Sequence, residues 1–251
     1  MAEALVALHG FSDSGRCWAP FLHRLGVPAR TPDLLAHGGR RMPAGVPFGH
    51  DALVEDVLPV VERAAADAGR PVVLLGHSLG ASTAAGVAAR APHLVALLVL
   101  EDPPWRPRGT AAADAAADRD NPHRPWLEGL QGTDHAGRRA WVEQRHPRWP
   151  AAEVDPWAES KAAVDLALFD AEQHWLHRGW AAVAARIRCP TLLLVGEEER
   201  GAACDAAVAH DLAGRPGWLV LSVAGAGHDV RRDRPALMAD LLRGLLRTYR
   251  C

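Results

Sequence analysis

The chain of 251 residues is poor in cysteine, in tyrosine and in long apolar runs. Its four cysteines have no C-x-x-C spacing, which argues against a disulfide framework or a zinc ribbon and favours reduced thiols. No apolar run reaches the roughly 18–20 residues that a membrane span needs. The N-terminus lacks a basic stretch followed by an apolar region and a cleavage site, so we expect no signal peptide and a cytoplasmic protein.

An excess of charge of one sign is also absent. Lys and Arg together number 28 and Asp and Glu number 30, which gives a formal net charge of −2. This balance provides no bulk electrostatic attraction to nucleic acid or to an anionic membrane surface. We therefore expect neither as a partner, and we expect a monomer or a homodimer.

Short apolar segments alternate with helical patterns along most of the chain. The apolar runs are continuous, which is typical of parallel strands that helices cover on both faces. We predict an α/β fold with a doubly wound, mostly parallel sheet. Pro59 predicts a kink or an early end in the second helix. The expected strands are 3–8, 71–75, 94–101, 190–195 and 217–223, and the expected helices are 15–25, 51–68, 79–90, 202–213 and 234–249.

Residues 103–185 contain no convincing strand and hold seven of the nine tryptophans. We interpret this segment as a helical cap over the carboxyl ends of the strands, where the active sites of such sheets lie. The core domain then comprises residues 1–102 and 186–251. Most of the tryptophans are expected to pack the cap onto the core, while Trp105 and Trp126 are predicted to contact substrate.

The sequence VVLLGHSLGAST at residues 72–83 places a serine between two glycines, after an apolar strand and before an alanine-rich helix. A chain reversal at Ser78 forces a strained backbone, and the residues two positions away must then be small, as Gly76 and Gly80 are. The reversal lifts the Ser78 hydroxyl above the sheet at a helix N-terminus, which favours developing negative charge. This pattern predicts that Ser78 is a nucleophile.

The chain resembles the α/β-hydrolase superfamily over essentially its whole length. The resemblance implies the α/β-hydrolase fold, and we expect no cofactor and no metal ion. The chain starts almost on the strand that precedes the oxyanion loop, so the first two antiparallel strands of the family are expected to be absent. The matching segments, in chain order, are HGFSDSGRCW (9–18), DLLAHG (33–38), GHSLG (76–80), LVLEDPP (98–104), LLLVGEEE (192–199) and GAGHDVRRDRP (225–235).

A serine hydroxyl needs a base to take its proton, and that base needs an acid to orient it. His228 fits the base, because it follows the last predicted strand in a loop with small glycines. Two residues are candidates for the acid. Glu199 stands at the family's commonest position, in a solvated run of acidic residues. Asp102 stands at a less common position, 24 residues after Ser78, between a buried strand and two prolines that suit a rigid orienting role.

The resemblance assigns the oxyanion donors to the backbone N–H groups of Leu79 and Phe11. Leu79 follows the nucleophile at the start of a helix, and Phe11 follows a glycine that allows close backbone approach. Asp13 and Trp18 lie in the same loop as Phe11 and are predicted to contact substrate.

These residues predict a serine hydrolase that cleaves a carboxylic ester or lactone through an acyl-enzyme on Ser78. The tryptophans of the cap favour a medium-sized apolar or aromatic substrate. A serine in place of an aspartate disfavours haloalkane dehalogenase and epoxide hydrolase chemistry. Two alternatives stay open. One is C–C bond hydrolysis, thioester hydrolysis or a lyase reaction on the same fold and triad, and the other is a non-catalytic small-molecule binding protein.

Overall fold

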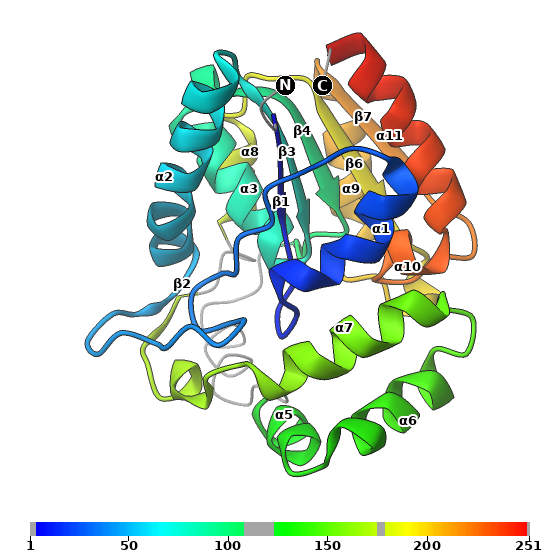
Figure 1. Cartoon of the computed structure of the whole chain (residues 1–251). Helices are drawn as coiled ribbons and strands as arrows, with labels where there is room; N and C mark the ends of the chain where they lie inside the picture. The colour runs from blue at the N-terminus through cyan, green and yellow to red at the C-terminus, as the bar shows by residue number, and fades with distance from the viewer. Residues whose placement is uncertain (1–3, 108–122, 175–178, 250–251) are drawn as a thin grey trace.

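Five short apolar strands form one sheet in which every described pairing is parallel (Figure 1). The computed structural model describes residues 4–107, 123–174 and 179–249. The strand order is β1-β3-β4-β6-β7, and an isolated parallel bridge joins Val6 of β1 to Arg30. Each strand begins and ends within two residues of its predicted position. The strands are β1 (Leu5–Leu8), β3 (Val72–His77), β4 (Val95–Glu101), β6 (Thr191–Val195) and β7 (Trp218–Ser222).

Side chains of the strands alternate between two apolar layers on opposite faces of the sheet. In β1, Val6 and Leu8 belong to one layer, while Leu5 and Ala7 belong to the other. Helices α2, α3, α8 and α9 cover the first layer, and α1 and α11 cover the second (Figure 1). No helix within the described ranges is long and apolar enough to cross a membrane. The helices are α1 (Ala19–Leu25), α2 (His50–Ala68), α3 (Leu79–Arg90), α8 (Trp180–Ala184), α9 (Ala206–Ala213) and α11 (Pro235–Tyr249).

Three helices differ from the sequence prediction. The expected helix 15–25 divides into a 3-10 helix, η1 (Gly15–Trp18), and α1, which begins at Ala19. Helix α2 continues through Pro59, so the predicted early end is wrong. Leu53 and Val61 are buried on either side of the proline, and their packing keeps both halves in one helix. Helix α9 begins at Ala206, four residues later than predicted, because the side chain of Asp205 caps its first turn.

Three helices of the predicted cap lie across the carboxyl ends of the strands (Figure 1). They share an apolar core of their own, in which Trp149 and Trp157 are buried. Residues 108–122 and 175–178 lie outside the described residues, so the boundaries of the cap at 103 and 185 stay a prediction. The three helices are α5 (His123–Gln131), α6 (His135–Arg145) and α7 (Ala151–Ala162).

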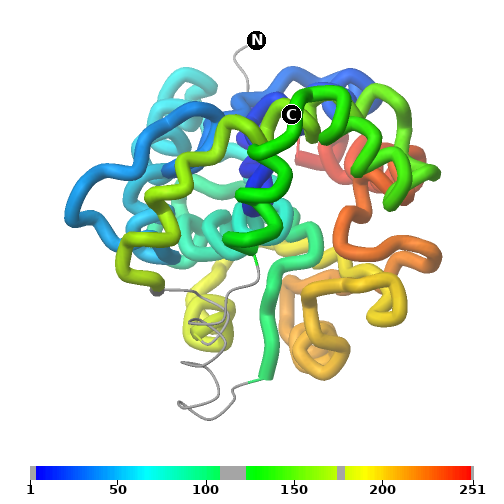
Figure 2. The backbone as a smooth tube through the Cα atoms, turned by 90° about the horizontal axis from the view of Figure 1, so that it is seen from below, coloured from blue at the N-terminus to red at the C-terminus, as the bar shows by residue number. Residues whose placement is uncertain are grey.

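The chain that follows α7 runs beside a loop of the core, as Figure 2 shows from below. Two short strands, β2 (Phe48–Gly49) and β5 (Gln173–His174), pair in parallel there. The amide of Gly39 donates to the carbonyl of Ala163 over 2.8 Å. Backbone hydrogen bonds thus attach the cap to the core on this side.

Candidate active site

Ser78 occupies a sharp turn between β3 and α3. Its backbone has φ 53° and ψ −116°, a conformation that residues other than glycine rarely adopt. A side chain at Gly76 would overlap the backbone of Gly80 and Ala81, and one at Gly80 would overlap the carbonyl of Leu8. The two glycines therefore permit the strained turn that the sequence predicts.

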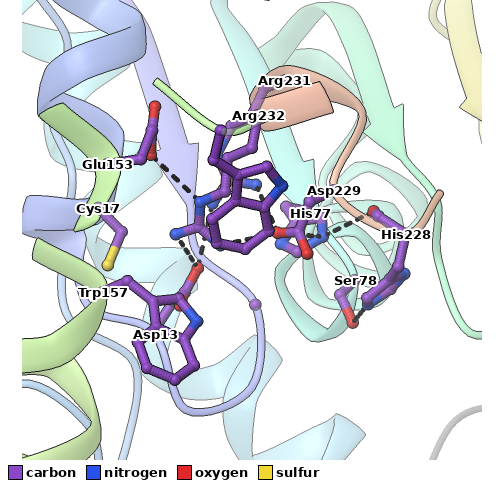
Figure 3. Close-up of polar contacts among 12 residues, drawn as sticks. Asp13, Cys17, His77, Ser78, Glu153, Trp157, His228, Asp229, Arg231 and Arg232 are labelled. Carbon is purple, nitrogen blue, oxygen red and sulfur yellow. Dashed lines mark hydrogen bonds and ion pairs between the residues drawn. The ribbon is translucent and has the colours of Figure 1, made fainter. Parts of the chain in front are cut away.

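Ser78, His228 and Asp102 form a hydrogen-bonded chain at the carboxyl ends of the strands. Ser78 Oγ lies 2.9 Å from His228 Nε2, and His228 Nδ1 lies 2.6 Å from Asp102 Oδ2. Figure 3 shows the Ser78 side chain directed at the His228 imidazole. With the Nδ1 proton donated to the carboxylate, Nε2 is left to accept the proton of the hydroxyl. This arrangement can generate a serine nucleophile.

The structure distinguishes the two candidate acids by position. Asp102 is fully buried, and its carboxylate also accepts hydrogen bonds from the amides of Ala203 (2.7 Å) and Cys204 (3.3 Å). Both amides belong to the loop after β6, which also carries Glu199. Glu199 itself is exposed, in a short 3-10 helix, η5 (Glu198–Arg200). The loop that carries Glu199 therefore supplies backbone donors that fix Asp102, while the carboxylate of Glu199 lies at the surface.

The environment of His228 strengthens its basicity. Removal from water disfavours the imidazolium, but the charges of Asp102, Asp229 and Glu101 outweigh this effect and raise the pKa of His228 above its ordinary value of 6.5. The strongest of these attractions is the hydrogen bond to Asp102. A raised pKa means that the imidazole accepts a proton readily, as a general base must.

The two predicted oxyanion donors follow Ser78 and β1, and their role stays a prediction. Leu79 is the first residue of α3, so its amide is at the N-terminus of the helix that follows Ser78. Phe11 lies in a turn directly after β1, which we call the oxyanion turn (residues 10–13). In this turn the amide of Asp13 donates to the carbonyl of Gly10 over 3.1 Å.

The side chain of Phe11 meets the cap. Its ring centroid lies 5.0 Å from that of His123 in α5 and 6.0 Å from that of Phe169 in the 3-10 helix η3 (Leu166–Phe169). Trp126 is half-buried, with its ring edge-on to His123 at 6.3 Å, and its contact with substrate stays a prediction. Aromatic side chains of the cap therefore lie next to the residue that is predicted to bind the oxyanion.

The predicted substrate contacts of Trp18 and Trp105 are wrong, because both side chains are completely buried. Trp105 packs in the core and donates its Nε1 proton to Ser82 Oγ over 3.1 Å. Trp18 lies beneath Arg231, whose guanidinium carbon is 4.5 Å from the ring centroid. Both tryptophans fill space between the sheet and its covering elements.

Sequence reasoning missed a buried charged cluster beside the triad. Asp13 is at its centre, where Oδ1 accepts from Lys161 Nζ (2.8 Å) and Oδ2 accepts from Arg231 (3.0 Å) and Arg232 (2.9 Å). The predicted substrate contact of Asp13 is therefore wrong, since these cations surround its carboxylate. They hold the pKa of Asp13 well below its usual value, although burial opposes them. The members of the charged cluster are Asp13, Glu101, Glu153, Lys161, Asp229, Arg231 and Arg232.

The charged cluster joins the cap to the loop that carries His228 and to the end of β4 beside Asp102. Arg232 binds Glu153 of α7 (3.1 Å) and Asp229 (2.7 Å), while Arg231 binds Glu101, the neighbour of Asp102. Figure 3 shows the two arginines beside Asp13 and Glu153, with His77 and Asp229 on the side of the Ser78–His228 pair. No group of three or more His, Cys, Asp or Glu side chains within the described residues is arranged to hold a metal ion. The adjacent arginines after the GHD sequence were the signal available in the sequence.

His77 links the turn at Ser78 to the loop that carries His228. Its ring is buried, and its Nε2 lies 3.1 Å from the carbonyl oxygen of His228, to which it donates. Burial, together with the positive charge of Arg231, holds the pKa of His77 well below its ordinary value, so the ring is neutral. The residue before Ser78 thus helps to fix the backbone of His228.

Comparison with known sequences shows the family of the chain. A model of the alpha/beta hydrolase family matches residues 5–241. A pimeloyl-[acyl-carrier protein] methyl ester esterase of Xanthomonas campestris is 30% identical over 238 residues, which cover 90% of this chain and 87% of the esterase. Lipase LipV of Mycobacterium tuberculosis is 38% identical over 100 residues, which cover 39% of this chain and only 36% of the lipase.

Solved structures share the same architecture. An esterase of M. tuberculosis superimposes with a TM-score of 0.74 at 21% sequence identity, over 98% of this chain and 85% of that one. At this identity the likeness shows the fold alone. Because the family model covers nearly the whole sequence, the conclusion is direct: the chain belongs to the alpha/beta hydrolase family.

Proposed function

We propose that this protein hydrolyses a carboxylic ester or lactone through an acyl-enzyme on Ser78. The observation that carries the proposal is the chain of hydrogen bonds from Ser78 through His228 to Asp102, with contacts of 2.9 and 2.6 Å on a strained turn. The relatives that are named as esterase and lipase support an ester as the scissile group.

The residues of the site have distinct roles in the proposed reaction. Ser78 Oγ attacks the carbonyl carbon while His228 Nε2 takes the hydroxyl proton. The same proton then passes to the leaving alkoxide, and His228 activates a water molecule that hydrolyses the acyl-enzyme. Asp102 stabilises the imidazolium and fixes its tautomer. The amides of Leu79 and Phe11 bind the oxyanion, a type of contact that contributes about 3–4 kcal/mol per donor.

The surroundings of Phe11 support the proposed substrate class. Its ring is in contact with His123 and Phe169 from the cap, and Trp126 stands beside His123. Rings in these places favour an apolar or aromatic group next to the reacting carbonyl. We therefore propose a medium-sized ester or lactone with such a group as the substrate.

Product partitioning tests the acyl-enzyme directly. Aryl esters that share one acyl group but differ in leaving group are hydrolysed in the presence of methanol, with Ser78→Ala as the control. The proposal predicts the same ratio of methyl ester to acid for every leaving group, since all of them form one acyl-enzyme. A ratio that depends on the leaving group, or the absence of methyl ester, would contradict it. A parallel panel of lactones then ranks the substrate classes.

A further inference from the structure

The oxyanion turn has a conformation that its sequence does not favour. The Asp13 amide donates to the Gly10 carbonyl, which closes a four-residue turn, and Ser12 at its third position has φ 63°. A turn with positive φ at the third position normally has glycine there, because a side chain strains the left-handed backbone. Such strain persists only where surrounding contacts hold the residue in place.

Lys161 makes the contacts that hold this turn. It is the only lysine of the chain, and it lies in cap helix α7 with 1% of its surface exposed. Its ammonium group donates to the carbonyl of Ser12 (2.9 Å), to Asp13 Oδ1 (2.8 Å) and to Ser160 Oγ (3.2 Å). These three acceptors satisfy all three protons of an ammonium group. The face of Trp157, at 4.6 Å, completes its surroundings.

The other cations of the charged cluster act on the turn only through the side chain of Asp13. Arg231 and Arg232 bind Asp13 Oδ2. Lys161 alone among these three donates to the turn's backbone, at the carbonyl of the strained residue itself. Without Lys161, the carboxylate of Asp13 would therefore stay paired with the two arginines. The backbone of Ser12 would lose its contact and could relax toward negative φ. That relaxation rotates the peptide planes that flank Ser12, beside the amide of Phe11.

We propose that Lys161 is a positioning residue that holds the oxyanion turn in its strained conformation, so that the docked cap helix α7 sets the oxyanion donor for catalysis. This inference rests on the proposed function, because it assigns an oxyanion role to the turn. It makes the cap a structural requirement of the chemical step, and not only a cover over the substrate. Lys161 does not touch the reacting atoms, and it acts through Ser12 and Asp13.

The first test is the kinetic effect of Lys161→Met, which keeps the length of the side chain and removes its donors. Removing one oxyanion donor outright lowers kcat by about 10²–10³, so a misplaced donor predicts a loss of about tenfold to a hundredfold. KM should change less than about threefold, because the contact matters in the transition state. Glu153→Gln is the matched control, since Glu153 lies on the same helix, is equally buried and pairs with Arg232 but does not touch the turn. The control should lower the melting temperature and keep kcat.

The second test is rescue. Glycine adopts positive φ without strain, so Ser12→Gly in the Lys161→Met background should restore kcat at least about fivefold while leaving the melting temperature low. A residue that only docks the cap would not be replaced by a glycine in the turn. If Lys161→Met does not fold, Lys161→Arg keeps the charge beside Asp13. Its planar donors do not match the three acceptors, so it should show the same loss of kcat and the same rescue.

A third measurement needs no substrate. Amide hydrogen exchange of a peptide that covers residues 9–16 should speed up in Lys161→Met and stay unchanged in Glu153→Gln. The inference is overturned if Lys161→Met keeps kcat within about twofold, if Glu153→Gln loses kcat equally, or if Ser12→Gly restores nothing. A wild-type protein that hydrolyses no ester and takes up no fluorophosphonate would instead refute the proposed function. The exchange comparison would still decide whether Lys161 holds the turn.

Discussion

The triad and the charged cluster are two sets of charges that lie side by side and differ in how completely they are paired. In the charged cluster, Asp13 faces three cations, and Lys161 uses all three of its protons. In the triad, His228 remains 32% exposed at its side chain, and its Nε2 contacts only a hydroxyl among the described residues. In the charged cluster the carboxylates face cations, while in the triad an imidazole nitrogen stays in contact with the Ser78 hydroxyl.

This difference separates the candidate active site from the charged cluster beside it. Buried charges that are fully paired fix geometry, and removing one partner leaves an uncompensated charge. A base that is to take a proton must instead keep a nitrogen available at the right distance. Glu101 directly precedes Asp102, and Asp229 directly follows His228, so the charged cluster can hold the backbone of both triad residues. Substitutions in the triad should affect catalysis, whereas Arg231 of the charged cluster should affect stability.

The largest effect is expected for Ser78→Ala. Loss of the nucleophile should lower kcat/KM by about 10⁴–10⁶ and leave the circular dichroism spectrum and the melting temperature unchanged. Steady-state hydrolysis of an aryl ester measures the loss. A folded variant with wild-type activity would show that the hydroxyl is not the nucleophile.

Asp102→Asn should come next, with a loss of about 10³–10⁴ in kcat, because an amide no longer fixes the reactive tautomer of His228. Glu199→Gln is the matched control, since Glu199 is exposed and His228 pairs with Asp102. That control should stay within about twofold of wild type in the same assay. A larger loss for Glu199→Gln than for Asp102→Asn would indicate that Glu199 is the acid of the triad.

The charged cluster should affect stability. Arg231→Met removes a fully buried cation from Glu101 and Asp13, and breaking such a pair costs about 3–5 kcal/mol. Urea denaturation measures the change in the free energy of unfolding. Arg124 offers an exposed comparison, because it pairs with Glu128 and Asp170 at the surface, and Arg124→Met should leave the denaturation midpoint unchanged. Equal effects of the two substitutions would contradict the structural role of the cluster.

The smallest effect is a pH dependence. The base must be neutral to accept a proton, so kcat/KM should rise by about tenfold per pH unit below the pKa of His228 and level off above it. Since Asp102 and its neighbours raise this pKa, the midpoint should lie above 6.5. A pH–rate profile of the wild type measures it. A flat profile from about pH 5 to about pH 8 would exclude a histidine base with this environment.

Local patterns in the sequence predicted the sheet, the strained turn at Ser78 and the place of His228 after the last strand. The five strands lie within two residues of their expected positions, because continuous apolar runs between turn residues are a strong local signal. The glycines on either side of Ser78 are a local signal as well, since the strained turn leaves no room for a side chain at these two positions. These features depend on residues that are close in sequence.

The contacts that the sequence did not predict join distant segments. Asp13 and Arg231 are 218 positions apart, and Asp13 and Lys161 are 148 positions apart. The position of Asp13 in the loop after the first strand suggested a substrate contact, because its cationic partners could not be identified from the sequence. The choice between Asp102 and Glu199 was open for the same reason, because it depends on which loop donates its amides to which carboxylate.

The most direct test of the account is the intact mass of the protein after incubation with a fluorophosphonate, for wild type and Ser78→Ala. An activated serine that is held by His228 and Asp102 predicts one phosphonyl adduct on the wild type and none on the variant. No adduct on folded wild-type protein, or an adduct that persists in Ser78→Ala, would contradict the claim that Ser78 is the nucleophile.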